Sequence, residues 1–281
     1  PDQPIRTGWL GRWMDATDDG ANPLRAVALG GGSPALVGER ARSTVVLDPA
    51  GFALRTPRGA DGDAIRRAFL ATAEPLLPDP MAAAAQQAIG SSLQAVDVLA
   101  QAASGPAGAQ ANGPAIEAGT ITGLLSTAAG IIDLQVGTEI IVVAGSGFDT
   151  HSDQTRRHQE LLADLAGGLT TFLDTIESRG QADQVLVITT SEFGRRVEEN
   201  GSGTDHGDGS VQFLAGPMVA GGQVVGQADL GDLVDGDLRS SIDSRSLYAN
   251  ALDWLSGPAG PTGVADEVLA LSADRYSLVR A

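Results

Sequence analysis

The most constraining feature of this 281-residue chain is a long helical pattern between two short runs of apolar, largely β-branched residues. The first run is TEIIVVAG, at residues 138–145, and the second is QVLVITT. Between them, residues 152–180 repeat leucine, phenylalanine and isoleucine at helical spacing. Ser152 or Asp153 is the expected N-cap and Gly180 the expected C-cap. This order predicts a βαβ unit, and therefore a parallel sheet with a right-handed crossover.

The remaining patterns divide the chain into two portions. The pattern of residues 1–115 predicts an N-terminal portion of helices and loops. It contains a helix over 81–103 and ends in the loop SGPAGAQANGPA. Residues 116–281 predict the α/β core, with a helix over 120–135 and a closing helix over 241–257. The fold class is therefore α/β with a parallel sheet.

Composition excludes several functions. Asp and Glu number 35 against 18 Lys and Arg, so the formal net charge is −17. A field of that sign repels nucleic acid and anionic membranes, and no apolar run is long enough to predict membrane insertion. The chain has no cysteine, which excludes disulfides, thiolate metal sites and cysteine nucleophiles.

Polar clusters follow both predicted strands. GFDTH, with Asp149 and His151, follows the first strand, and SEFGRR, with Glu192, follows the second. Ligands of open α/β sheets bind at the carboxyl ends of the strands, so we expect both clusters at one edge. A third cluster, NGSGTDHGDGS, adds Asp205 and His206 from a glycine-rich loop.

These clusters predict a site for a divalent metal ion. Carboxylates and imidazoles suit zinc, manganese or a similar ion, and closely spaced carboxylates repel unless a cation lies among them. The predicted ligands are Asp149, His151, Asp205 and His206. The alternative is that the histidines cap turns and that the aspartates are turn residues.

Three nearby side chains leave alternatives open. His158 either points to the same edge or is a histidine in the first turns of a helix that is satisfied by a neighbour. Arg195 either clamps an anionic group or pairs with a surface glutamate. Ser191 is a candidate nucleophile, but no spacing singles out a serine–histidine–aspartate triad.

Five ordered motifs indicate a family. They are GWLGRWMD near the start, GFDTHSDQ, SEFGRR, TDHG, and DSRSLYANALDWL near the end. With them the chain resembles, over nearly its whole length, the domain-of-unknown-function family 1501, which is grouped with the alkaline-phosphatase-like and sulfatase-like superfamily. The resemblance implies a doubly wound α/β core, one or two metal ions and hydrolysis of phosphate or sulfate esters. It also implies export from a bacterial cell, to the periplasm or beyond.

The resemblance also assigns residues. Asp149 and His151 match ligands of one metal ion, with His206 near the same ion. Glu192 and Phe193 stand where the superfamily usually has an aspartate and a histidine; a phenylalanine cannot bind a metal ion, so the chain departs from the superfamily at the second metal site. The family's N-terminal metal-binding and nucleophile motifs do not occur in the sequence, so a missing N-terminal segment is expected.

Two functions from different classes follow as expectations. The first is a metal-dependent hydrolase-like protein, with zinc favoured over manganese or calcium, whose partners are an anionic small-molecule ester and the missing segment. Its catalytic candidates are Glu192, Ser191 and Arg195. The alternative is a non-catalytic exported binding or assembly protein that keeps the hydrolase fold. A metal-independent serine esterase is a third, weaker expectation.

Overall fold

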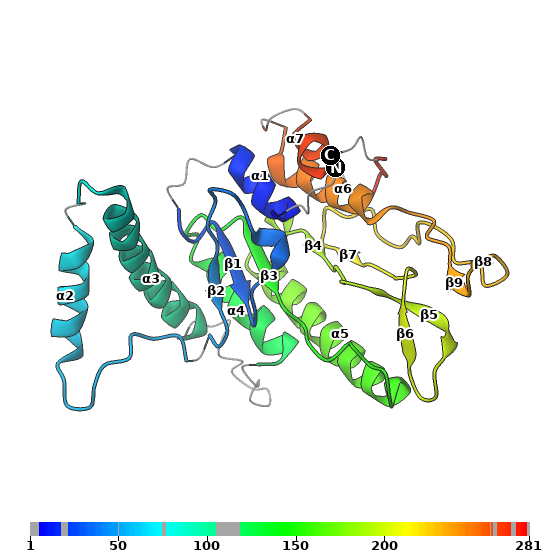
Figure 1. Ribbon diagram of the computed structural model, residues 1–281, viewed down its shortest axis with the longest axis horizontal. Coiled ribbons are helices and arrows are strands. Elements are labelled where there is room, and N and C mark those ends of the chain that lie inside the picture. The colour runs from blue at the N-terminus through cyan, green and yellow to red at the C-terminus, as the bar shows by residue number, and fades with distance from the viewer. Residues whose placement is uncertain are drawn as a thin grey trace. The chain divides into compact units, whose positions relative to one another are not determined.

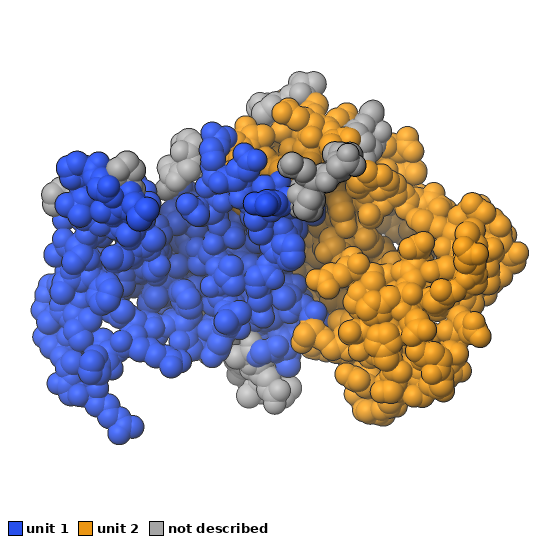
Figure 2. Space-filling view, in the orientation of Figure 1, with its two compact units in different colours: residues 1–11, 18–145 blue, residues 12–17, 146–281 orange. Residues whose placement is uncertain are grey.

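The structure, a computed structural model, divides into two compact units. One unit contains residues 1–11 and 18–145, and the other contains residues 12–17 and 146–281 (Figure 2). The predicted boundary between residues 115 and 116 lies outside the described residues. The described residues are 6–17, 22–49, 51–74, 77–104, 119–258, 260, 263–270 and 274–279.

A three-stranded parallel sheet lies in the first unit. Its strands are β1 (Ala26–Leu29), β2 (Thr44–Val46) and β3 (Ile140–Val143), in the order β2-β1-β3 (Figure 1). All four residues of β1 are buried, as expected for the central strand of a parallel sheet. Arg25, just before β1, pairs with Glu139, just before β3, at 2.7 Å. The sequence patterns predicted β3 but not the four-residue β1, which is too short to show a clear period.

Helices complete the first unit. They are the 3₁₀ helix η1 (Pro34–Leu36), α2 (Gly62–Ala73), α3 (Pro80–Ser104) and α4 (Ile121–Asp133). The bounds of α3 and α4 confirm the two helices predicted in this region. Leu99 of α3 and Leu124 and Ile131 of α4 are almost fully buried.

The second unit contains the long helix that the sequence predicts over residues 152–180, and further helices toward the C-terminus. Its helices are α5 (Gln154–Ser178), α6 (Ser244–Ser256), α7 (Val264–Leu269) and the 3₁₀ helix η2 (Ala182–Gln184). The helix α1 (Trp9–Thr17) starts in the first unit and ends in the second. In the second unit, Trp13 donates a hydrogen bond to Ser256, and Arg12 donates one to the carbonyl oxygen of Val268. These bonds attach the end of α1 to the C-terminal helices.

The strands of the second unit form three antiparallel pairs. The pairs are β4 (Val187–Ile188) with β7 (Leu214–Ala215), β5 (Gly194–Glu199) with β6 (Thr204–Gly207), and β8 (Leu233–Val234) with β9 (Asp237–Leu238). The prediction of a βαβ unit around α5 is therefore wrong. Although β3, α5 and β4 form in the predicted order, β4 pairs antiparallel with β7 and does not join the sheet of β3. An apolar run indicates that a strand is buried but does not indicate its partner.

The mixed α/β class is confirmed, with a parallel sheet of three strands and seven α-helices among the described residues. Within the same residues, no helix combines the length and the apolar character that a membrane crossing requires.

One glycine in α5 gives a stability prediction. Gly167 is exposed, and a β-carbon added to it would meet no atom within 4 Å. Glycine in a helix interior destabilises a protein by about 0.5–1 kcal/mol relative to alanine. We therefore expect Gly167→Ala to raise the free energy of unfolding by about that amount in urea denaturation.

The matched control is Gly130→Ala in α4. Here an added β-carbon would lie 2.5 Å from the carbonyl oxygen of Ala102, which belongs to the backbone of α3. The same substitution should therefore destabilise, by about 1–3 kcal/mol. Equal effects at the two glycines would contradict this account of the helix packing.

Candidate metal centre

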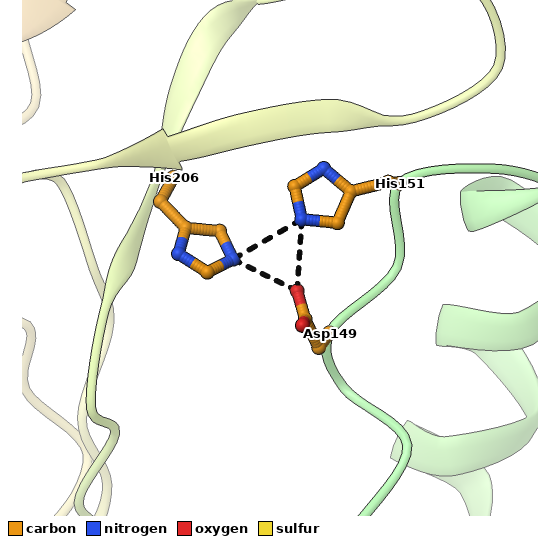
Figure 3. Close-up of side chains that lie close together, drawn as sticks. All are labelled: Asp149, His151 and His206. Carbon is orange, nitrogen blue, oxygen red and sulfur yellow. Dashed lines mark hydrogen bonds and ion pairs between the residues drawn. The ribbon is translucent and has the colours of Figure 1, made fainter.

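Two segments of the second unit carry the three side chains of the candidate site. Asp149 and His151 lie in the segment between β3 and α5, and His206 lies on β6. Between the first two, Thr150 is fully buried, whereas Asp149 and His151 are exposed. Figure 3 shows the three side chains pointing toward one another, although 55 residues separate the two histidines in sequence.

The distances allow the three side chains to share one metal ion. Asp149 Oδ1 lies 2.8 Å from His206 Nε2 and 3.0 Å from His151 Nε2. The two Nε2 atoms lie 3.2 Å apart. One ligand atom from each residue therefore lies within 4.8 Å of the others, an arrangement that can hold one metal ion. The side chains of Asp149, His151 and His206 are 60%, 48% and 45% exposed, so the cluster faces solvent.

The charges around Asp149 favour its ionised form. The pKa of Asp149 is lowered, chiefly because His206 donates a hydrogen bond to the carboxylate. Desolvation acts in the opposite direction, and the electrostatic interactions with His151, His206 and Arg195 add to the lowering. The carboxylate is thus held in the form that binds a cation.

The loop between β5 and β6 holds the ligand segment, which is the stretch between β3 and α5 that carries Asp149 and His151. Ser202 accepts a hydrogen bond from the Asp153 backbone N–H through its hydroxyl, at 3.0 Å, and one from the Gln154 N–H through its carbonyl, at 2.9 Å. Asp153 is the N-cap residue of α5, as predicted, but its own side chain makes no capping bond. The loop therefore caps α5 from outside the helix. At the other end, Gly180 follows the helix with a left-handed φ of 67°.

Gly203, in the same loop, lies against His151. A β-carbon on Gly203 would lie 2.5 Å from the carbonyl carbon of His151. Only glycine therefore allows the loop to approach the ligand segment this closely. The sequence marked this loop as glycine-rich but gave no sign of which glycine meets His151.

The predicted ligand Asp205 lies beside the cluster. Its Oδ1 accepts a hydrogen bond from Asn200, at 2.6 Å, and lies 3.7 Å from His151 Nδ1. It thus faces the ring nitrogen that points away from the other two ligands. A carboxylate in that place can orient a metal-binding imidazole.

Of the three predicted catalytic residues, Arg195 contacts the cluster, whereas Ser191 and Glu192 are not among the residues whose ligand atoms converge. Arg195 lies at the cluster, with Nη2 3.6 Å from Asp149 Oδ1. Ser191 is exposed, and its hydroxyl donates a hydrogen bond to the carbonyl oxygen of Phe193 at 2.7 Å. Glu192 is exposed and is not among the residues whose ligand atoms converge.

Two aromatic contacts were not predicted. The ring of Phe193 stacks on His206, with centroids 3.7 Å apart and an angle of 5° between the planes. The ring of His158 packs edge-on against Phe148, with centroids 5.7 Å apart. His158 thus contacts the segment that carries Asp149 but is not among the residues whose ligand atoms converge. The resemblance to the superfamily, in which a histidine is usual at the place of Phe193, was the available sign that this position lies near the site.

Comparison with known proteins identifies a family. The model of the family described as "Protein of unknown function (DUF1501)" matches residues 3–256. The chain belongs to this family. The resemblance seen in the five sequence motifs is thereby confirmed at the level of the family. No curated protein and no solved structure matches the chain. The DUF1501 match includes both segments of the candidate metal centre.

Proposed function

We propose that this DUF1501 protein is an exported, metal-dependent hydrolase-like protein that acts on phosphate or sulfate esters. The observation that carries the proposal is the convergence of Asp149, His151 and His206 at a surface open to solvent. Three protein ligands with an open position are typical of catalytic zinc sites, whereas structural sites have four protein ligands.

The donor set fits a transition metal. Two imidazole nitrogens and one carboxylate oxygen suit zinc, and manganese is the next choice. Calcium takes six to eight oxygen ligands, so the two histidines disfavour it. When bound, the ion would polarise a phosphoryl or sulfuryl oxygen and neutralise the charge of an anionic ester on this acidic protein.

The superfamily relationship, the doubly wound core and the export of the protein belong to the same proposal. They rest on the resemblance of the sequence motifs to the alkaline-phosphatase-like and sulfatase-like proteins. The parallel order of β2, β1 and β3 supports the fold part of the proposal, since such a sheet is the core of a doubly wound domain.

A second candidate is an exported binding or assembly protein in which the metal has no catalytic role. Two observations favour it. The Ser191 hydroxyl donates a hydrogen bond to the Phe193 carbonyl oxygen, and the Phe193 ring, which cannot bind a metal ion, stacks on His206.

A hydrolysis assay separates these functions. The zinc-loaded protein should turn over chromogenic phosphate or sulfate esters, lose this activity on chelation and regain it when zinc returns. Turnover that survives chelation would support a serine esterase instead. A protein that binds zinc and turns over none of these esters would support the binding or assembly function.

A further inference from the structure

Arg195 contacts both segments that carry the metal ligands. Its Nη1 donates a hydrogen bond to the carbonyl oxygen of Thr204, at 2.6 Å, two residues before His206. Its Nη2 donates one to the carbonyl oxygen of Phe148, at 2.7 Å, directly before Asp149. A single guanidinium thus connects two stretches of backbone that are distant in sequence.

The remaining contacts of Arg195 involve the ligands. Nη2 lies 3.6 Å from Asp149 Oδ1, and the guanidinium carbon lies 5.0 Å from the centre of the Phe193 ring, which stacks on His206. In the β5–β6 ladder, Arg195 is directly paired with His206. The Arg195 side chain is only 18% exposed, less than half the exposure of any of the three ligands.

We propose that Arg195 is a positioning residue that holds the two ligand-bearing segments in register, and that it is not a clamp for the substrate anion. The inference rests on the proposed metal site. Both amino groups of the guanidinium are engaged with backbone carbonyls, and the side chain is more buried than the ligands it connects. A planar guanidinium holds its donors in a fixed fork and suits two carbonyls at once, whereas a lysine ammonium is a compact charge on a flexible stem.

The test measures zinc affinity in the full chain by competition with a chromogenic chelator. We expect Arg195→Ala to weaken zinc binding by about 10–100-fold, the usual cost of losing a group that orients metal ligands. Arg195→Lys should give an intermediate loss, although it keeps the charge. If Arg195→Ala does not fold, the zinc affinity of Arg195→Lys still tests the proposal.

Two further readouts distinguish positioning from general damage. Low millimolar guanidinium should restore part of the zinc affinity of Arg195→Ala, and the visible spectrum of the cobalt-substituted variant should differ from that of the parent. The control is Arg156→Ala, which removes a guanidinium that pairs with Asp153 and Glu160 on α5. It should bind zinc like the parent.

The outcomes separate the two proposals. Parent and Arg195 variants with equal zinc affinity and identical cobalt spectra would overturn the role of Arg195 while leaving the metal site intact. Equal losses in the Arg156 and Arg195 variants would also overturn it, because the loss would then not depend on the contacts that Arg195 makes with the two ligand-bearing segments. A parent that binds no metal would overturn both the site and this role.

Discussion

Replacing His206 by alanine should weaken zinc binding by at least about 100-fold, because it removes a direct ligand and not merely a group that orients one. His206 Nε2 is 2.8 Å from Asp149 and 3.2 Å from the same nitrogen of His151, so its loss leaves only two converging ligand atoms. Isothermal titration of the metal-free protein with zinc measures the change. His151→Ala should have an effect of the same order.

The chain supplies its own matched control in its third histidine. His158 packs against Phe148 and is not part of the cluster, so His158→Ala should keep the zinc affinity of the parent within about threefold. A loss at His158 as large as the loss at His206 would show that zinc binds wherever histidine is available, and would count against the site.

The second large effect is expected at Gly203, which carries no ligand atom. An added β-carbon would lie 2.5 Å from the His151 carbonyl carbon and 2.7 Å from its oxygen, both in the backbone. Because a backbone cannot rotate away as a side chain can, Gly203→Ala must displace the loop from the ligand segment. We expect zinc affinity to fall by about 10–100-fold and the free energy of unfolding to fall by about 1–3 kcal/mol.

Gly221→Ala is the control for this substitution. Gly221 lies in the same unit, and an added β-carbon would meet no atom within 4 Å. It should leave zinc affinity and stability nearly unchanged, as measured by titration and urea denaturation. Parent-like zinc binding in Gly203→Ala would contradict the packing that joins the loop to His151.

The candidate site could largely be predicted from sequence because its ligands are chemically rare. The chain has three histidines, and two of them stand beside aspartates in polar clusters. That pattern identified Asp149, His151 and His206, and the structure brings them together. It could not rank Asp205 against Asp149, because the choice depends on which side of the His151 ring each carboxylate faces.

The supporting residues could not be predicted in the same way. Ser202, Gly203 and Arg195 act through backbone atoms of the segment before α5, and such contacts depend on how a loop folds back across the chain. The pairing of β4 with β7 was missed for a related reason, since apolar runs do not specify partners. Helical periodicity is local, and α3, α4, α5 and α6 were accordingly predicted close to their observed bounds.

The most direct test of the central claim is the zinc stoichiometry of the full chain. The metal-free protein would be equilibrated with a slight excess of zinc, freed of unbound ion, and analysed by plasma mass spectrometry beside a His151→Ala/His206→Ala double variant. We predict about one zinc ion per chain in the parent and none in the variant. The absence of zinc from the parent, or equal zinc in the two proteins, would contradict a metal centre at Asp149, His151 and His206.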